Sequence, residues 1–471
     1  MKMKGKPVLS WALALIVLFV TAIRCSDDKK TPVPAQNIVA LASANTNLSS
    51  LVAALSKFPD LVSTLSGSGN FTVFAPTNQA FTALLAAIGQ TDINNVPDDV
   101  LKSILQYHVI TSGAVRSTQL TAGNVNTAAN ENIAVTINPI KLNTNTNVTT
   151  ADVLASNGVV HIIDQVLVNP SILPIVGTIY APAYFNKDFS TLVAAVKGAS
   201  QSTRDLLLNS TKKTLFAPNN AAFTAAGITS LPTTAAAIDA ILAYHVLGSE
   251  VRAANLPNVA APGNSEITTV GGGKFYLSNR GSAGVFINGR TQVTQTDIIA
   301  SNGVVHVINR TLTPPTQTIA QIATALSTGS PAQFTQLVAA LTRIPALLNA
   351  ASGTSSNLTV FAPTDAAFQQ LYTDLGVTGL SQINDATLTA VLQHHIISAP
   401  TTATGRVFSR DLVTANVATL NGNISINATA GTVTGSLSGS RTATISTDAN
   451  LVNVLGNNGV IHTINQVLRP Q

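Results

Sequence analysis

Cysteine and charged residues are scarce in this sequence. The chain of 471 residues has a single cysteine, Cys25, so it cannot form an internal disulfide or a zinc site built from several thiolates. Charged residues make up 10% of the chain, whereas soluble domains usually carry about a quarter. Thr, Ser, Asn and Ala must therefore cover much of the surface, which suits neutral contacts and gives weak electrostatic steering.

The N-terminal segment has the layout of a secretory signal. An apolar run over residues 8–23 follows three lysines, Lys2, Lys4 and Lys6. The run is shorter than the ~20 residues that a membrane-spanning helix needs. We therefore expect residues 1–24 to be a signal peptide that is removed on export.

The cysteine directly after this segment predicts a lipid anchor. Its position predicts lipid attachment at Cys25, as in bacterial lipoproteins, with residues 25–36 as a tether. Ala22 fits the lipoprotein pattern, whereas Arg24 stands where a small residue is expected. The pair Asp27-Asp28 resembles a tag that sends some lipoproteins to the cell exterior, so we expect a surface-exposed outer-membrane lipoprotein. The alternative is a soluble secreted protein with an unpaired cysteine.

Loss of the signal changes the charge balance. The full chain has 25 basic and 20 acidic residues, and the signal contains four of the basic ones, so 21 against 20 remain and the net charge falls from +5 to +1. The high isoelectric point of about 9.3 thus reflects the targeting segment. A nucleic-acid partner loses its main support.

Two phrases recur three times in the same order. A phrase containing Phe-Ala-Pro lies at residues 70–81, 214–223 and 358–368. A closing Asn-Gly-Val-Val/Ile-His phrase lies at residues 157–161, 302–306 and 458–462. The Phe-Ala-Pro prolines Pro76 and Pro218 are 142 residues apart, and Pro218 and Pro363 are 145 apart. A period of this length is that of a whole domain, so the chain is a tandem array.

A third phrase lies between the other two, and its Tyr-His or His-His pairs are Tyr107-His108, Tyr244-His245 and His394-His395. Together the three phrases resemble the fasciclin domain family over nearly all of the chain after residue 36. The resemblance implies an α+β fold of three tandem fasciclin-like domains, each a compact wedge of β-strands with packed α-helices. We place them at residues 37–170, 171–314 and 315–471.

The resemblance also implies adhesion or extracellular association rather than catalysis. Within the family the Tyr-His phrase is associated with receptor adhesion, which makes Tyr107, His108, Tyr244 and His245 candidate adhesion residues. His394 and His395 are the third-unit counterparts, and His394 departs from the pattern by replacing the tyrosine. The alternative is that these side chains only pack and cap the end of a helix.

Periodicity within each unit predicts helices first and strands later. A strand should end at Pro76, and Asn78, Asn220 and Asp365 are expected to cap the following helices. Pro97 should open a helix that ends near His108. Each Asn-Gly phrase should form a turn that leads into a closing strand, in which the histidine shares a face with aliphatic residues and is a core residue.

No pattern of an enzyme is visible in the sequence. A Gly-x-Ser-x-Gly elbow is lacking, and the histidines have neither cysteine nor acidic clusters beside them, so we expect no catalytic residue, no cofactor and no metal site. The predicted function is non-enzymatic adhesion or matrix association through a cell-surface or matrix protein or glycan. The alternative is a periplasm-facing lipoprotein that binds a small molecule or glycan in a cleft.

Overall fold

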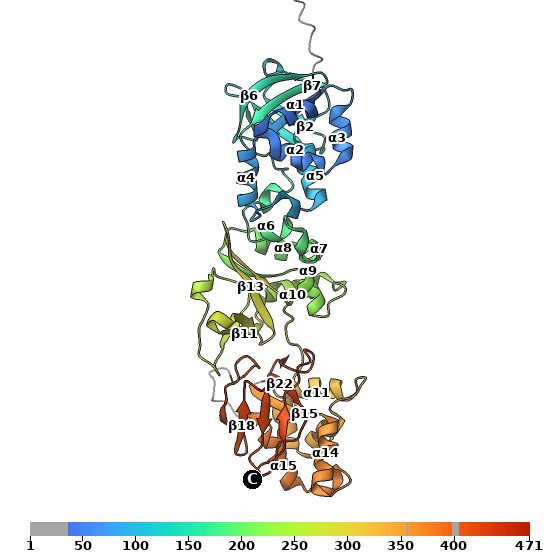
Figure 1. Ribbon diagram of the computed structural model, residues 1–471, viewed down its shortest axis with the longest axis vertical. Coiled ribbons are helices and arrows are strands. Elements are labelled where there is room, and N and C mark those ends of the chain that lie inside the picture. The colour runs from blue at the N-terminus through green and yellow to red at the C-terminus, as the bar shows by residue number, and fades with distance from the viewer. Residues whose placement is uncertain (1–35, 355–356, 398–404) are drawn as a thin grey trace, which may run out of the picture.

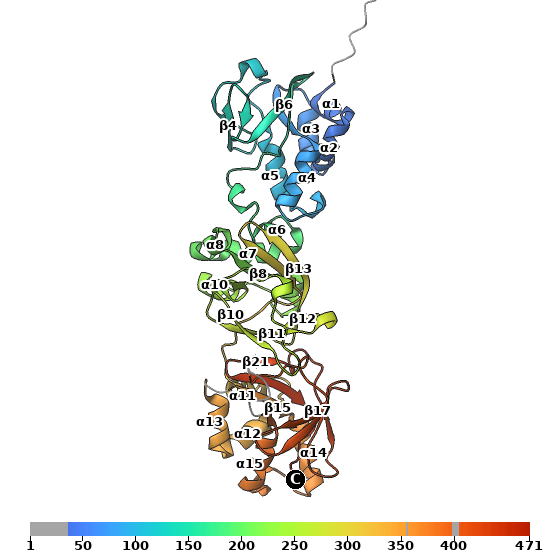
Figure 2. The ribbon, with the colours of Figure 1, turned by 90° about the vertical axis from the view of Figure 1, so that its left-hand side faces the viewer.

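Three domains follow one another in an elongated row (Figures 1 and 2). The computed structural model describes residues 36–354, 357–397 and 405–471. The predicted signal peptide, the lipid attachment at Cys25 and nearly all of the tether lie outside the described residues. The first helix, α1 (Ile38–Ala44), lies at the opposite end of the row from the C-terminus (Figure 1).

Each domain begins with helices and continues with strands, as the periodicity predicts. The first contains α2 (Ser49–Ser56), α3 (Pro59–Ser66), β1 (Phe71–Pro76), α4 (Asn78–Ala87), α5 (Asp98–Tyr107), β2 (Val109–Ile110), β3 (Gly123–Asn126), β4 (Asn132–Thr136), β5 (Lys141–Leu142), β6 (Thr146–Ala155) and β7 (Gly158–Ile163). The predicted strand end at Pro76 and the helix that begins after Pro97 are both confirmed.

The second domain repeats this order. It contains α6 (Ala181–Tyr184), α7 (Ser190–Gly198), α8 (Gln201–Leu208), β8 (Lys213–Pro218), α9 (Asn220–Ala225), α10 (Ala235–Tyr244), β9 (Val246–Leu247), β10 (Ser265–Thr268), β11 (Lys274–Asn279), β12 (Val285–Ile287), β13 (Thr291–Ala300) and β14 (Gly303–Ile308).

The third domain contains α11 (Ile319–Ser327), α12 (Thr335–Arg343), α13 (Pro345–Ser352), β15 (Leu358–Pro363), α14 (Asp365–Leu375), α15 (Asp385–His394), β16 (Ile396–Ile397), β17 (Ala415–Ala418), β18 (Asn423–Asn427), β19 (Thr432–Thr434), β20 (Thr442–Thr444), β21 (Val454–Gly456) and β22 (Gly459–Ile464).

The first and last repeated phrases form neighbouring strands. The Phe-Ala-Pro strand pairs in parallel with the closing strand in every domain, as β1 with β7, β8 with β14 and β15 with β22. The closing strand also forms a hairpin with the strand before it, and the Asn-Gly phrase lies at the turn, as predicted. Two phrases separated by more than 80 residues thus form neighbouring interior strands in each domain.

The sheet of the third domain is divided in two. In the first domain the ten-residue β6 joins the strands on both sides into one seven-stranded sheet, and β13 does the same in the second. Its counterpart β21 has three residues, so the third domain has two four-stranded sheets. The helices pack on one side of each sheet and the later strands enclose a second apolar cluster, which gives the α+β wedge.

The predicted helix caps are wrong by one residue. The preceding residues Thr77, Asn219 and Thr364 accept from the free amides of α4, α9 and α14. Asn78, Asn220 and Asp365 instead accept from the N–H groups that begin another helix. Their donors are Ser50 at 2.8 Å, Thr191 at 2.9 Å and Gln336 at 2.7 Å. These side chains therefore join two helices, which local sequence does not reveal.

Candidate functional site

The histidine that ends the helix fastens it to the last segment of its domain. His108 Nδ1 donates to the carbonyl of Ile104 at 2.7 Å, and Nε2 accepts from the N–H of Leu167 at 2.9 Å. Two further rings make the same pair of bonds, His245 to Ile241 and Leu312, and His395 to Val391 and Leu468. Because Nε2 accepts, each ring is neutral with its proton on Nδ1.

The residue before each of these histidines is also buried and bonded to backbone. Tyr107 and Tyr244 are at most 1% exposed, and their hydroxyls donate to the carbonyls of Asn132 and Lys274 at 2.7 and 2.6 Å. His394 has no exposed surface and reaches the carbonyl of Asn421 through Nδ1 at 2.5 Å.

All six candidate adhesion residues are buried. Tyr107, His108, Tyr244, His245, His394 and His395 are each at most 3% exposed. A partner that docks on the surface cannot touch these side chains directly. The geometry therefore favours the alternative that the phrase packs and caps the helix end.

Stability should fall on mild acidification because these rings resist protonation. Burial lowers the pKa of His108, His245 and His395 to about 4, from an ordinary value near 6.5. Between pH 6.5 and 4 the unfolded chain binds a proton at each ring and the folded chain does not, so the free energy of unfolding declines as pH falls. We expect the first domain to lose about 2 kcal/mol between pH 6.5 and 5, and the other two to lose more, because burial also lowers the pKa of His306 and, to about 4, that of His462.

Urea unfolding at pH 7.5, 6 and 5 measures this loss. Carboxylates with lowered pKa lose their contribution only below about pH 4.5, so they do not account for a decline above pH 5. A His108→Asn chain should be less stable at pH 7.5 but flatter with pH in its first domain. Equal stability of the unaltered chain at pH 7.5 and 5 contradicts the assignment.

The closing-strand histidines are core residues, as predicted. His161 and His306 accept at Nδ1 from the N–H groups of Asp152 and Asp297, both at 3.3 Å, and their Nε2 atoms donate to carbonyls. His462 donates from Nε2 to the Val407 carbonyl at 2.8 Å, but its Nδ1 lacks a partner among the described residues. The three rings lie 5.4–5.6 Å from phenylalanine rings of the neighbouring strands.

The asparagine of the closing phrase is a structural residue that sequence reasoning missed. Asn157 is 4% exposed; its Oδ1 accepts from the N–H of Ile38 at 3.0 Å, and its Nδ2 donates to the carbonyls of Leu65 and Gly67 at 2.8 Å. Asn302 and Asn458 repeat these contacts. Its recurrence in all three phrases was the available signal.

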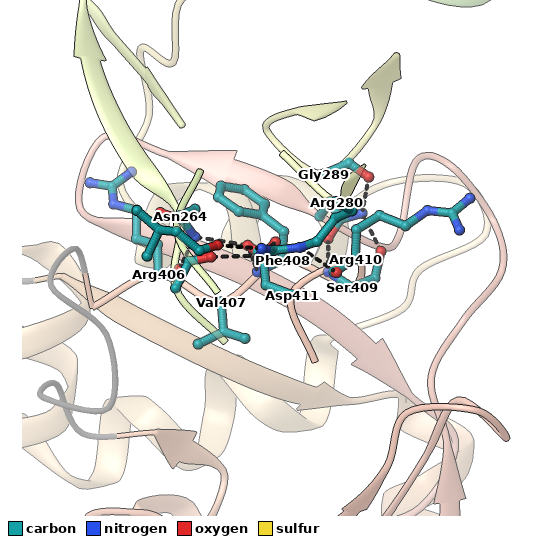
Figure 3. A network of polar contacts seen from close by, with 12 residues as sticks. Asn264, Arg280, Gly289, Arg406, Val407, Phe408, Ser409, Arg410 and Asp411 are labelled. Atoms are coloured by element: carbon teal, nitrogen blue, oxygen red, sulfur yellow. Dashed lines mark hydrogen bonds and ion pairs between the residues drawn. The ribbon is translucent and has the colours of Figure 1, made fainter. Parts of the chain in front are cut away.

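A buried ion pair joins the second and third domains (Figure 3). Arg280 donates from Nη2 to Asp411 Oδ1 at 2.6 Å, and the Asp411 side chain has no exposed surface. The other carboxylate oxygen accepts from Asn264 at 2.8 Å and from the N–H of Phe408 at 3.2 Å. Arg280 also donates to the carbonyls of Val259, Gly263 and Arg410.

Aromatic packing and a close backbone approach complete this junction. The Tyr276 ring lies 5.8 Å from the Phe408 ring and 4.7 Å from the Arg406 guanidinium carbon. Gly289 has a φ of +65°, and a Cβ there would lie 2.5 Å from the Phe408 Cβ. The first domain has Thr144 at the corresponding turn position, so its tip cannot dock in the same way.

The first two domains meet through different surfaces. Gln90 is 8% exposed and donates to the carbonyl of Pro182 in α6 at 3.1 Å. Lys187 donates to the carbonyl of Asn94 at 3.1 Å. Phe185, which follows α6, is a member of the first domain's apolar core. Side-chain contacts therefore hold both junctions of the row.

One exposed aliphatic position recurs on the strand before the closing strand. Leu154 on β6 and Ile299 on β13 occupy the same register, opposite Val159 and Val304, and each is 54% exposed. The third-domain counterpart, Leu455, packs with Tyr276 and Phe408 at the junction with the second domain. The same strand position is thus a domain contact in one unit and exposed in the other two.

A polar cleft of about 480 Å³ lies between the second and third domains. The second domain contributes the start of β13 and the connection after β14, and the third contributes α11 and the segment before β21. The lining includes Asn288, Arg290, Thr291, Thr311–Gln317, Ile322, Ala325, Leu326, Asn450 and Asn453–Leu455. The apolar cavity beneath α1 in the first domain is much smaller, at about 70 Å³.

The described residues contain neither a cluster of metal-ligating side chains nor a single helix fit to cross a membrane. Within residues 36–354, 357–397 and 405–471, no group of three or more His, Cys, Asp or Glu side chains is arranged to hold a metal ion. No single helix in these residues is long and apolar enough to cross a membrane; one pair bent by 106°, residues 38–44 with 46–56, meets the length and composition criteria together.

Comparison with known proteins identifies the three units. The sequence model of the fasciclin domain matches residues 46–169, 187–314 and 332–470. Protein sll1483 of Synechocystis sp. is 44% identical over 137 residues, which cover 29% of this chain and 75% of that protein.

Two animal proteins match over a longer part of the chain. Pig transforming growth factor-beta-induced protein ig-h3 is 30% identical over 262 residues, covering 53% of this chain and 35% of its own. Human periostin is 26% identical over 341 residues, covering 71% of this chain and 37% of its own. The chain thus spans little more than a third of these two relatives.

A solved structure also matches. It is a FAS1 domain pair from the insect cell adhesion molecule fasciclin I, with 17% identity, a TM-score of 0.27, and coverage of 60% of this chain and 96% of that one.

Proposed function

Because the chain belongs to the fasciclin domain family, we propose that it is a non-enzymatic adhesion or matrix-association protein, held at the cell surface by a lipid on Cys25. The observation that carries the proposal is that the three domains lie in a row (Figure 2) and that side-chain hydrogen bonds and an ion pair join them at both junctions. A row of this kind presents repeated surfaces at set spacings. Weak contacts at several domains then give avidity when the partner's sites match that spacing.

The proposed partner is a cell-surface or matrix protein or glycan. The mature chain is almost neutral, so short-range packing and hydrogen bonds are expected to dominate over electrostatic steering. Exposed Leu154 and Ile299 are the repeated positions best suited to such packing. The buried Tyr107 and His108, with their counterparts, contribute to attachment only indirectly in this proposal, by holding each domain together.

Serine at both exposed positions should weaken attachment. We expect cells that display Leu154→Ser/Ile299→Ser protein to attach to a matrix-coated surface several-fold less than cells with the unaltered protein. Both side chains are more than half exposed, so the fold should be little affected. Attachment is counted after washing, with display levels matched by antibody labelling of intact cells.

Two controls separate the parts of this proposal. Leu173→Ser alters a side chain that is also 54% exposed, but in the connection between domains, and should leave attachment unchanged. Cys25→Ser should release the protein from the membrane fraction and remove attachment altogether. Equal attachment by the double variant and the unaltered chain places the binding surface elsewhere, and labelling only after permeabilisation contradicts surface display.

The second candidate function is a periplasm-facing lipoprotein that binds a small molecule or glycan. The cleft of about 480 Å³ between the second and third domains favours it, because ligand sites commonly lie at domain interfaces and have volumes of roughly 300–1,000 Å³.

A further inference from the structure

The cleft between the second and third domains contains a guanidinium with unused donors. Arg290 lines the cleft, and its Nε and Nη2 atoms are buried without a hydrogen-bond partner among the described residues. No carboxylate among the described residues forms an ion pair with Arg290. Burying a hydrogen-bond donor without a partner costs free energy, and the cost is larger when the donor belongs to a charged group.

The two unused nitrogens lie on the same edge of the guanidinium. The N–H of Nε and one N–H of Nη2 point in parallel, and this spacing matches the two oxygens of a carboxylate. Oxyanions with this spacing can accept both bonds at once, whereas a neutral hydroxyl can accept only one. The free edge of Arg290 therefore selects for an oxyanion over a neutral hydroxyl, and a carboxylate is the oxyanion that saccharides commonly carry.

The charges around Arg290 leave room for a negative ligand. Burial and the nearby Arg310 lower its pKa to about 10, and Asp448 acts in the opposite direction. The side chain stays protonated at neutral pH. A single added carboxylate would offset the unfavourable pairing of the two arginines.

Neutral hydrogen-bonding groups and aliphatic side chains share the rest of the cleft lining. Thr311 Oγ1 is a further buried atom without a partner among the described residues. Other polar lining residues retain exposed surface, among them Thr313, Thr316, Gln317 and Asn450. One fixed cation surrounded by hydroxyls, amides and aliphatic side chains suits a ligand with one acid group on a body that has both hydroxyls and C–H faces, as a saccharide ring does.

The turn between β12 and β13, which contains Arg290, does not require arginine at that position. Asn143 and Asn288 occupy the same position in the two β-turns, both at positive φ, and each accepts from an N–H of the neighbouring strand. Two residues further along, the first domain has Asn145 where the second has Arg290. Thr146 and Thr291, which follow, are both buried strand residues. Arginine therefore appears where a third domain closes the cleft, rather than where the hairpin needs it.

We propose that this cleft binds a saccharide that carries a carboxylate, such as a hexuronic acid unit. On binding, the Arg290 and Thr311 side chains, whose polar atoms are buried in this structure, turn toward the ligand. Arg290 then donates its two parallel N–H groups to the carboxylate, and Thr311 bonds to a neighbouring ring hydroxyl. This inference rests on the second candidate function and gives it a ligand class.

Calorimetric titration of the purified Cys25→Ser chain tests the inference. The probes are a hexuronic acid oligomer, a neutral hexose oligomer of the same length and linkage, and inorganic sulfate. We expect the acidic oligomer to bind saturably at one site, with the neutral oligomer and sulfate at least about 10-fold weaker. Arg290→Asn, which installs the first domain's residue, should reduce affinity about 10- to 100-fold.

Matched variants distinguish binding from folding. Arg252→Asn removes an exposed arginine of the same domain and should leave affinity unchanged. Arg290→Lys keeps the charge but loses the parallel donors, so it should bind about 10-fold more weakly even if Arg290→Asn proves unstable. Absence of binding by the acidic oligomer, equal binding by sulfate, or unchanged affinity in both Arg290 variants overturns the inference. Cell attachment by Arg290→Asn cells is a separate measurement, and its result concerns the adhesion proposal alone.

Discussion

Replacement of Gly303 by alanine is expected to prevent the second domain from folding. The residue has a φ of +146° and begins the closing strand β14, where a Cβ would lie 2.0 Å from the backbone oxygen of Lys213. That oxygen belongs to β8, the parallel neighbour of β14 inside the sheet, so neither strand can move aside without loss of their pairing. We expect a loss on the order of 4 kcal/mol or more, from steric overlap together with backbone strain.

Hydrogen exchange resolved by peptide measures this effect domain by domain. Amides of the second domain should lose protection, while those of the first and third domains exchange much as before. Gly272→Ala is the matched control, because Gly272 also has a positive φ, +76°, but no atom lies within 4 Å of the added Cβ. Its cost should be about 1 kcal/mol. Similar protection in the two variants would show that the close approach at Gly303 is not rigid.

Removal of the Asp411 carboxylate should uncouple the second and third domains. In an Asp411→Ala chain Arg280 keeps its charge and its buried position but loses its partner, and Asn264 loses an acceptor. Breaking one side of a buried ion pair typically costs about 3–5 kcal/mol, and we expect a loss in this range here. Calorimetry should then show separate unfolding transitions for the two domains. Small-angle scattering should show that the second and third domains no longer keep one fixed arrangement.

The control for this variant is another aspartate of the third domain. Asp374 pairs with Arg441 at 2.9 Å on the surface, where the arginine is 53% exposed. Exposed pairs contribute about 0–1 kcal/mol, so Asp374→Ala should leave the unfolding profile almost unchanged. Equal effects of the two substitutions would mean that the junction does not depend on the buried pair.

The repeats made the fold accessible from sequence, whereas the roles of particular polar residues were harder to assign. The strand that ends at Pro76, the helix that begins after Pro97 and the core position of His161 follow from local patterns, and the structure confirms them. Asn78 was expected to cap its own helix but bonds to the start of α2, 28 residues earlier. A side chain's partner depends on which helices become neighbours, and hydrophobic periodicity does not encode that choice.

The role of the candidate adhesion phrase could not be assigned from local sequence either. Tyr107 and His108 recur with their counterparts at the end of each helix, and recurrence alone is compatible with a binding surface or with a packing role. Their burial at 0% and 2% exposure favours packing. Leu154 and Ile299 stay exposed, whereas their counterpart Leu455 packs at the junction with the second domain, so exposure at this strand position depends on where the neighbouring domain sits.

By itself the sequence determined the number of domains, their order of helices and strands, and the family to which they belong, because these properties depend on local periodicity and on phrases repeated at domain spacing. Tertiary structure alone decided how the domains join. Arg280 and Asp411 are separated by 131 residues, and Arg290 faces a cleft whose other wall lies in the next domain. Such contacts arise only when separately folded surfaces meet, so their energies depend on relative placement and burial, which no local pattern records.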